Sequence, residues 1–120
     1  MINCFFVGLG GFIGSVFRYL IGLIPLNEDM VFRVKTLAIN IIGAFIIGLI
    51  AAASAKGHAI SPRFVLFLKV GICGGFTTFS TFALESLDLI KDGHAGMALV
   101  YVILSTVLGI LAVFAGEMVV

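Results

Sequence analysis

The sequence predicts an all-α membrane protein that forms one domain of four transmembrane helices over residues 1–120. Hydrophobic residues make up 62% of the chain and charged residues only 11%, whereas soluble domains carry about 25% charged and about 45–50% apolar residues. Four apolar runs are each long enough for a helix to cross the hydrocarbon, which takes about 20 residues. The composition also excludes disorder, and the net charge of +1 leaves no basic surplus for nucleic acid.

The first predicted span covers residues 3–24 and is free of charge up to Arg18. It has no basic start and no small-residue cleavage site, so we do not interpret it as a signal peptide. Gly10 and Gly14 form a G-x-x-x-G pair, a spacing that lets helix backbones approach closely in lipid. Arg18 should lie near the membrane surface, where it either extends to water or attracts an anion to a vestibule.

The second predicted span, residues 36–55, is uncharged, and Asn40 is its only strongly polar side chain. An amide inside a bilayer needs a partner or a cavity, and Asn40 offers two N–H donors. Two roles remain open for it: a hydrogen bond between helices, or a donor that faces a polar pathway.

The third predicted span, residues 64–90, contains a run that disfavours a continuous helix. Gly74 and Gly75 are followed by the β-branched Thr77 and Thr78 in the middle of the span. We therefore expect the third helix to be broken near its centre, where protein or a water-filled cavity must cover the freed backbone groups. Broken helices at the midplane hold ions in transporters. The alternative is a glycine packing contact without any break.

Polar and aromatic side chains follow this expected break. Phe79 and Phe82 are three residues apart and share a helix face, while Ser80 and Thr81 point to neighbouring faces. Glu85 lies one turn beyond Thr81 and continues a stripe from hydroxyl to carboxylate. A phenylalanine pair at this spacing is usually a core contact, but in a pore the positive ring edges could face an anion without trapping it.

The fourth predicted span, residues 95–116, is uncharged and carries one polar and small stripe, in which Tyr101, Ser105 and Gly109 repeat every four residues. Together with the groups on the second and third spans, this stripe could line a narrow polar pathway without a fixed cation at its centre.

No residue pattern indicates an enzyme or a zinc site. Cys4 and Cys73 lie in apolar runs and are expected to be buried small hydrophobic residues. His58 and His94 fall in predicted loops, and no spacing of histidine, cysteine and acidic residues suggests zinc. No nucleophile and base are paired, so catalysis is not expected.

The charged residues near the membrane surfaces do not favour one orientation. Short loops rich in Lys and Arg stay in the cytoplasm, but here the two sides carry almost equal numbers. One side has Lys56, Arg63 and Lys69, and the other has Arg18, Arg33, Lys35 and Lys91. The chain is therefore expected to insert both ways round, and two opposed copies could form a dimer with its two-fold axis in the membrane plane.

Three motifs, in order along nearly the whole chain, resemble the Fluc (CrcB) family of fluoride channels: GGFIGSVFRY at 10–19, TLAINIIG at 36–43 and GICGGFTTFSTF at 71–82. The last is highly specific. The resemblance implies an antiparallel, dual-topology homodimer in the cell (inner) membrane, with two fluoride pores. It also implies passive export of toxic cytoplasmic fluoride.

The same resemblance implies roles for individual residues. Phe79 and Phe82 would turn their ring edges toward fluoride, and Asn40 would point its amide at the ion. A structural sodium ion at the dimer axis would be held by the backbone carbonyls of Gly74 and Thr77. The other groups of the fluoride pathway would be Ser80, Thr81, Glu85, Tyr101 and Ser105, with Arg18 near the vestibule. Some relatives carry a serine where this chain has Gly109.

Two other classes of function fit the sequence less well than a channel. A small multidrug-type proton-coupled exporter also uses four short spans, but it needs an acidic residue in the first span, and residues 3–24 contain none. A non-conducting structural subunit would leave the motif at 71–82 without a purpose. A fluoride channel is therefore the expected function.

Overall fold

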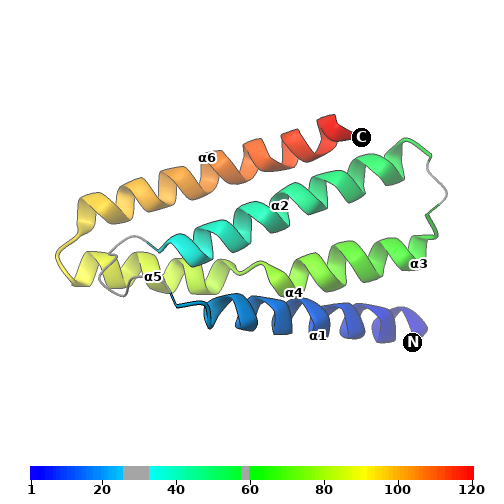
Figure 1. Cartoon of the computed structure of the whole chain (residues 1–120), viewed down its shortest axis with the longest axis horizontal. Helices are drawn as coiled ribbons and strands as arrows, with labels where there is room; N and C mark the ends of the chain where they lie inside the picture. Colours follow the sequence, from blue (N-terminus) through cyan, green and yellow to red (C-terminus); the bar gives the residue numbers. More distant parts are fainter. Residues whose placement is uncertain (26–32, 58–59) are drawn as a thin grey trace.

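The computed structural model describes residues 1–25, 33–57 and 60–120. All regular elements in these residues are helices, and four of the helical segments are long and apolar enough to cross a membrane. They run up and down side by side, and both termini lie toward the end of the molecule that holds the connection from α2 to α3 (Figure 1). The first, second and fourth segments are single helices: α1 (Ile2–Gly22), α2 (Val34–Ala55) and α6 (Ala95–Val119).

The third segment, from Pro62 to Lys91, is divided into several elements. Ser61 precedes it, and its Oγ accepts a hydrogen bond of 3.2 Å from the Phe64 amide, which is a normal way to begin a helix. Proline in the first turn suits this start because its missing N–H would have no partner there. The elements are α3 (Pro62–Val65), the π-helix η1 (Leu66–Cys73), α4 (Gly74–Phe76) and α5 (Phe79–Lys91).

Regular helix stops for two residues between α4 and α5. Thr77 has φ −81° and ψ 158°, and Thr78 has φ −149° and ψ 114°, so both are extended. Gly74 and Gly75, which are poor helix formers, are nevertheless helical in α4. Figure 1 shows the thin connection that joins the two halves of the third segment.

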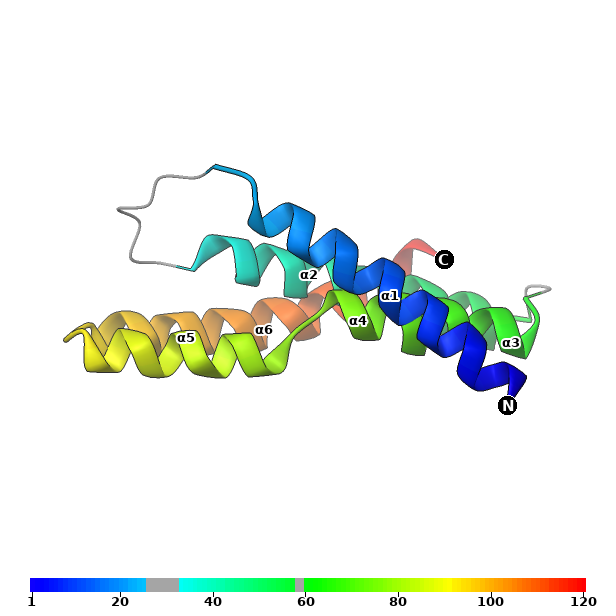
Figure 2. The same ribbon diagram turned by 90° about the horizontal axis from the view of Figure 1, so that it is seen from below.

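The helices pack in two main pairs. α2 lies along α6, while α1 lies against η1 and α4. Seen from below, α1 crosses α4 close to the point where the third segment is interrupted (Figure 2). α5 continues beyond this crossing and packs on α6 instead. The interruption therefore lies where the third segment passes from α1 to the other pair of helices.

Glycines make the contact between α1 and the third segment possible. A Cβ added at Gly10 would overlap the Phe67 carbonyl oxygen, and one at Gly14 would overlap that of Ile72. From the other side, a Cβ at Gly75 would lie 2.6 Å from the Gly11 carbonyl oxygen. The predicted G-x-x-x-G pair thus faces backbone, as expected for close helix packing in lipid.

Few side chains are buried within the single chain, because lipid rather than protein covers most apolar surfaces of a membrane helix. A small cluster forms around Tyr101, Leu89 and Ala98, against which Phe82 packs. Cys73 is buried, as predicted, but the same prediction is wrong for Cys4, which is exposed in the first turn of α1. An apolar run in a membrane span does not require contact with protein.

Candidate functional site

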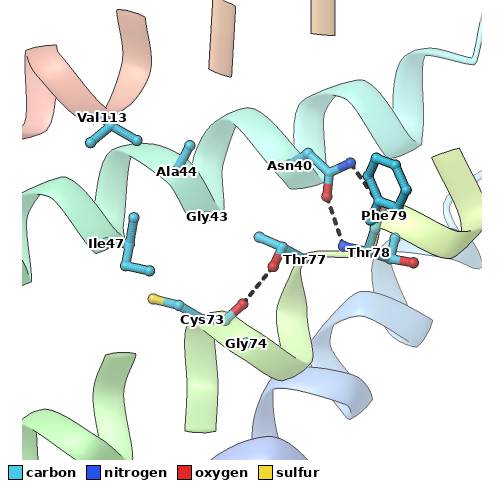
Figure 3. Close-up of a pocket in the computed structure, with 10 residues that line it drawn as sticks. All are labelled: Asn40, Gly43, Ala44, Ile47, Cys73, Gly74, Thr77, Thr78, Phe79 and Val113. Carbon is cyan, nitrogen blue, oxygen red and sulfur yellow. Dashed lines mark hydrogen bonds between the residues drawn. The ribbon is translucent and has the colours of Figure 1, made fainter. Parts of the chain in front are cut away.

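The interruption between α4 and α5 is held by the side chain of Asn40 on α2. Asn40 Nδ2 donates to the Thr78 carbonyl oxygen at 3.1 Å, and the Thr78 amide donates back to Asn40 Oδ1 at 2.8 Å. Figure 3 shows this pair of hydrogen bonds. One Asn40 N–H is used in the pair, and an amide nitrogen carries two. Of the two roles that the sequence left open for Asn40, the hydrogen bond to another transmembrane segment is present. The second N–H of Asn40 takes no part in this pair.

A cavity of about 330 Å³ adjoins this pair. It lies where α2, α4 and the start of α5 meet, with α6 on its far side (Figure 3). The polar or aromatic members of its lining belong to the predicted site or lie next to it: Asn40, Cys73, Thr77, Thr78 and Phe79. The other lining residues are small or apolar, as suits a cavity at membrane depth. The cavity brings together the predicted asparagine, the first predicted phenylalanine and the interrupted backbone.

Two backbone carbonyls beside the cavity are deprived of their ordinary helical donors. In a continuous helix the Thr78 amide would bond the Gly74 carbonyl, and the Thr81 amide would bond that of Thr77. Here the Thr78 amide bonds Asn40 instead, and the Thr81 amide bonds Thr78 Oγ1 at 3.2 Å. Carbonyl oxygens released in this way are suitable ligands for a hard cation. The predicted sodium ligands therefore fit the local backbone.

Three aromatic rings lead away from the cavity along α5 and α6. The ring centroids of Phe79 and Phe82 are 5.7 Å apart, and those of Phe82 and Tyr101 are 5.1 Å apart. Phe79 is 78% exposed in the single chain, whereas Tyr101 is fully buried. The Tyr101 hydroxyl donates to Glu85 Oε1 at 3.0 Å. The predicted Phe pair, Tyr101 and Glu85 thus form one continuous row of contacts.

The predicted hydroxyl groups are less uniformly placed. Ser80 is exposed in the single chain, and its Oγ lies 3.5 Å from Thr78 Oγ1. Thr81 is half-buried at the start of α5. The Ser105 hydroxyl is buried, and no group in the described residues forms a hydrogen bond with it. A buried hydroxyl of this kind is normally satisfied by a partner, so Ser105 has capacity for a further ligand or water.

Arg18 lies near the other side of the interruption, on α1. Its Nε donates to the Gly75 carbonyl oxygen at 3.2 Å. It also lines a second cavity of about 400 Å³ with Ser15 and Tyr19, among others. The sequence left open whether Arg18 extends to water or serves a vestibule, and it gave no indication of this bond to the backbone of the third segment.

The role of the Thr78 side chain was not predicted from the sequence. Thr78 is the N-cap residue of α5, with its hydroxyl bonded to the Thr81 amide. The signal was present, because threonine is a favoured N-cap and the following residues form a good helix. Of the two histidines, His94 is the N-cap residue of α6, and His58 lies outside the described residues.

Comparison with known proteins gives a consistent result along the chain. Residues 5–117 match the model of the family described as CrcB-like protein, Camphor Resistance (CrcB). A protein of Agrobacterium fabrum is 45% identical over 117 residues, which is 97% of this chain and 94% of the relative. A protein of Chlorobium chlorochromatii is 42% identical over 110 residues, which is 92% and 85% respectively. Both are named fluoride-specific ion channel FluC.

These relatives are named as channels and not as enzymes, in agreement with the class expected from the sequence. With its four apolar helices, the chain is a multi-pass membrane protein. The match extends over almost all of its length, including the interrupted third segment and Asn40. The chain therefore belongs to the CrcB family.

Proposed function

We propose that this protein is a fluoride-selective channel that exports toxic cytoplasmic fluoride passively. The observation that carries the proposal is a cavity lined by Asn40 and Phe79, from which ring contacts run through Phe82 to Tyr101. It is found in a chain whose relatives are named fluoride-specific channels. Fluoride is small and strongly hydrated, so a pore must replace its water with several weak donors.

The proposed pathway offers donors that hold an anion weakly. The N–H of Asn40 that the Thr78 pair does not use, the ring edges of Phe79 and Phe82, and the Ser105 hydroxyl are all uncharged. Ser80 and Thr81 would continue the path toward Glu85. A desolvated lysine or arginine at its centre would bind the anion too strongly for fast release, and this row contains neither.

We propose that the channel works as an antiparallel homodimer. The nearly equal numbers of basic residues at the two membrane surfaces support insertion in both orientations. The high exposure of Phe79 in the single chain supports a second copy that encloses the pathway. A two-fold axis in the membrane plane would relate the copies and give two equivalent pores.

A structural sodium ion on that axis is part of the proposal. The Gly74 and Thr77 carbonyls, whose usual helical donors are bonded elsewhere, would be its ligands from each copy. Bound sodium would supply positive charge that stabilises the converging carbonyls, without taking part in conduction. We expect the dimer to dissociate or unfold more readily when sodium is replaced by N-methylglucamine. Equal dimer stability in both buffers would contradict the sodium site but not the fluoride channel.

The experiment that tests the function is fluoride efflux from proteoliposomes, measured with a fluoride electrode. Rapid fluoride loss with retention of chloride in matched vesicles is the expected result, and protein-free vesicles set the background. Efflux should proceed without a proton gradient, because no coupling is proposed. Absence of fluoride efflux from folded dimers would refute the function, whereas equal loss of chloride would refute its selectivity.

A further inference from the structure

The bond between Arg18 and Gly75 joins α1 to the third segment at the end of α4. Gly10 and Gly14 are four residues apart on α1, and both approach the backbone of η1 and α4. Arg18 is one further turn along the same face. The close glycine contact therefore brings the arginine side chain beside the last residues of α4, where its Nε reaches the Gly75 carbonyl at 3.2 Å.

The Gly75 carbonyl has a specific need for such a donor. In a continuous helix it would accept from the Phe79 amide, but the extended Thr77 and Thr78 separate α4 from α5. The final carbonyls of a helix also carry partial negative charge, which a cation stabilises. Arg18 meets both requirements, because it supplies a hydrogen bond and a positive charge at the point where α4 ends.

We propose that Arg18 is a positioning residue that caps the C-terminal end of α4 through its Nε–H. By holding the Gly75 carbonyl, it fixes the place at which the chain leaves α4, and so the place from which Thr78 reaches Asn40. In this role the N–H donor at Nε matters more than the positive charge. For a vestibule residue that attracts anions, the charge would matter more. Where fluoride flux is concerned, this inference rests on the proposed function.

Three substitutions separate the donor from the charge. In R18Q, the amide Nε2 occupies the same place along the side chain as the arginine Nε, so a donor remains without a charge. In R18K, a methylene group stands at that place and the charge remains one atom further out. R18M has neither. The three variants have similar lengths, which makes them matched controls for one another.

The direct measurement is hydrogen exchange at the Thr77, Thr78 and Thr81 amides of the full-length protein in nanodiscs. These amides are protected by bonds to Cys73, Asn40 and Thr78 across the interruption. Loss of a hydrogen bond from a charged donor should speed their exchange by about tenfold or more in R18M and R18K. R18Q keeps a neutral donor and should stay within about threefold of wild type. Fluoride flux, measured in parallel, should fall less in R18Q than in R18K.

The opposite order, with R18K close to wild type and R18Q resembling R18M, would overturn the inference in favour of charge. Equal exchange rates in all four proteins would also overturn it, as would failure of both R18Q and R18K to fold. If only R18M fails to fold, the exchange rates of R18Q and R18K are sufficient to test the inference. Exchange does not depend on fluoride, so a failed cap and a failed channel proposal give different results.

Discussion

Replacement of Asn40 is the most informative test of the interruption between α4 and α5. Its side chain forms two hydrogen bonds with the backbone of a single residue, Thr78, at 3.1 and 2.8 Å. Asn40→Ala removes both bonds. Asn40→Asp in its ionised form keeps an acceptor for the Thr78 amide but places an acceptor-only oxygen where Nδ2 stood, opposite the Thr78 carbonyl. We therefore expect aspartate to be more disruptive than alanine.

The expected magnitude follows from the two backbone groups that lose their partner. A buried polar group left unsatisfied costs about 1–3 kcal/mol, so Asn40→Ala should cost about 2–6 kcal/mol. The cavity of about 330 Å³ beside Asn40 gives room for replacement water. The value should consequently lie near the lower end, about 2 kcal/mol, and Asn40→Asp should exceed it because two acceptors would face each other.

The assay is reversible unfolding of the reconstituted protein, with fluoride flux measured on the same preparations. Asn3→Ala is the matched control, because Asn3 also forms a side-chain hydrogen bond, to Arg63 at 3.3 Å, but at an exposed site. It should change the unfolding free energy by less than about 0.5 kcal/mol. An Asn40→Ala protein as stable as the control, or an Asn40→Asp protein as stable as wild type at a pH where the carboxyl is ionised, would refute the assigned role of the bond pair.

Three further predictions concern the pathway and the packing that supports it. Phe79→Ile and Phe82→Ile should abolish fluoride flux while the variants still elute like the wild-type protein in size-exclusion chromatography, and undiminished flux would count against the ring-edge role. Gly14→Ala should lower the unfolding free energy by about 1–3 kcal/mol because its methyl would overlap the backbone of η1. The control Gly8→Ala, where no atom lies within 4 Å of the added methyl, should be neutral or stabilising. Equal effects of the two substitutions would contradict the close contact between α1 and the third segment. Tyr101→Phe should cost about 1.5–3 kcal/mol of unfolding free energy through the lost bond to a carboxylate, and a silent substitution would contradict this contribution.

The positions of the spans could be predicted because hydrophobicity alone determines which segments can cross a bilayer. Each of the four helical segments overlaps most of one predicted apolar run. The contact between Phe79 and Phe82 could also be predicted, since the two residues lie three apart on one helix. Properties set by composition, or by spacing within one helix, are therefore visible in the sequence.

Properties set by contacts between distant segments are not visible in the sequence. The partner of Asn40 is a backbone group 38 residues away, and that of Arg18 is 57 residues away, with no side-chain type to reveal either bond. The π-helix η1 depends on which carbonyl each amide selects, which residue identities in the run do not specify. Cys4 was wrongly predicted to be buried by protein. An apolar sequence does not show whether protein or lipid covers a residue, because both do so equally well.

The bond pair between Asn40 and Thr78 has a consequence for how this family can vary. Asn40 binds the main chain of its partner, which offers the same N–H and C=O in every residue type except proline, while the Thr78 hydroxyl separately caps α5. A change at position 78 therefore leaves the contact with Asn40 chemically possible, and no compensating change at position 40 is called for. In a large set of aligned relatives the two positions should vary independently, although their atoms touch. Contact inference from covariation would overlook the bond that holds the two halves of the third segment in place.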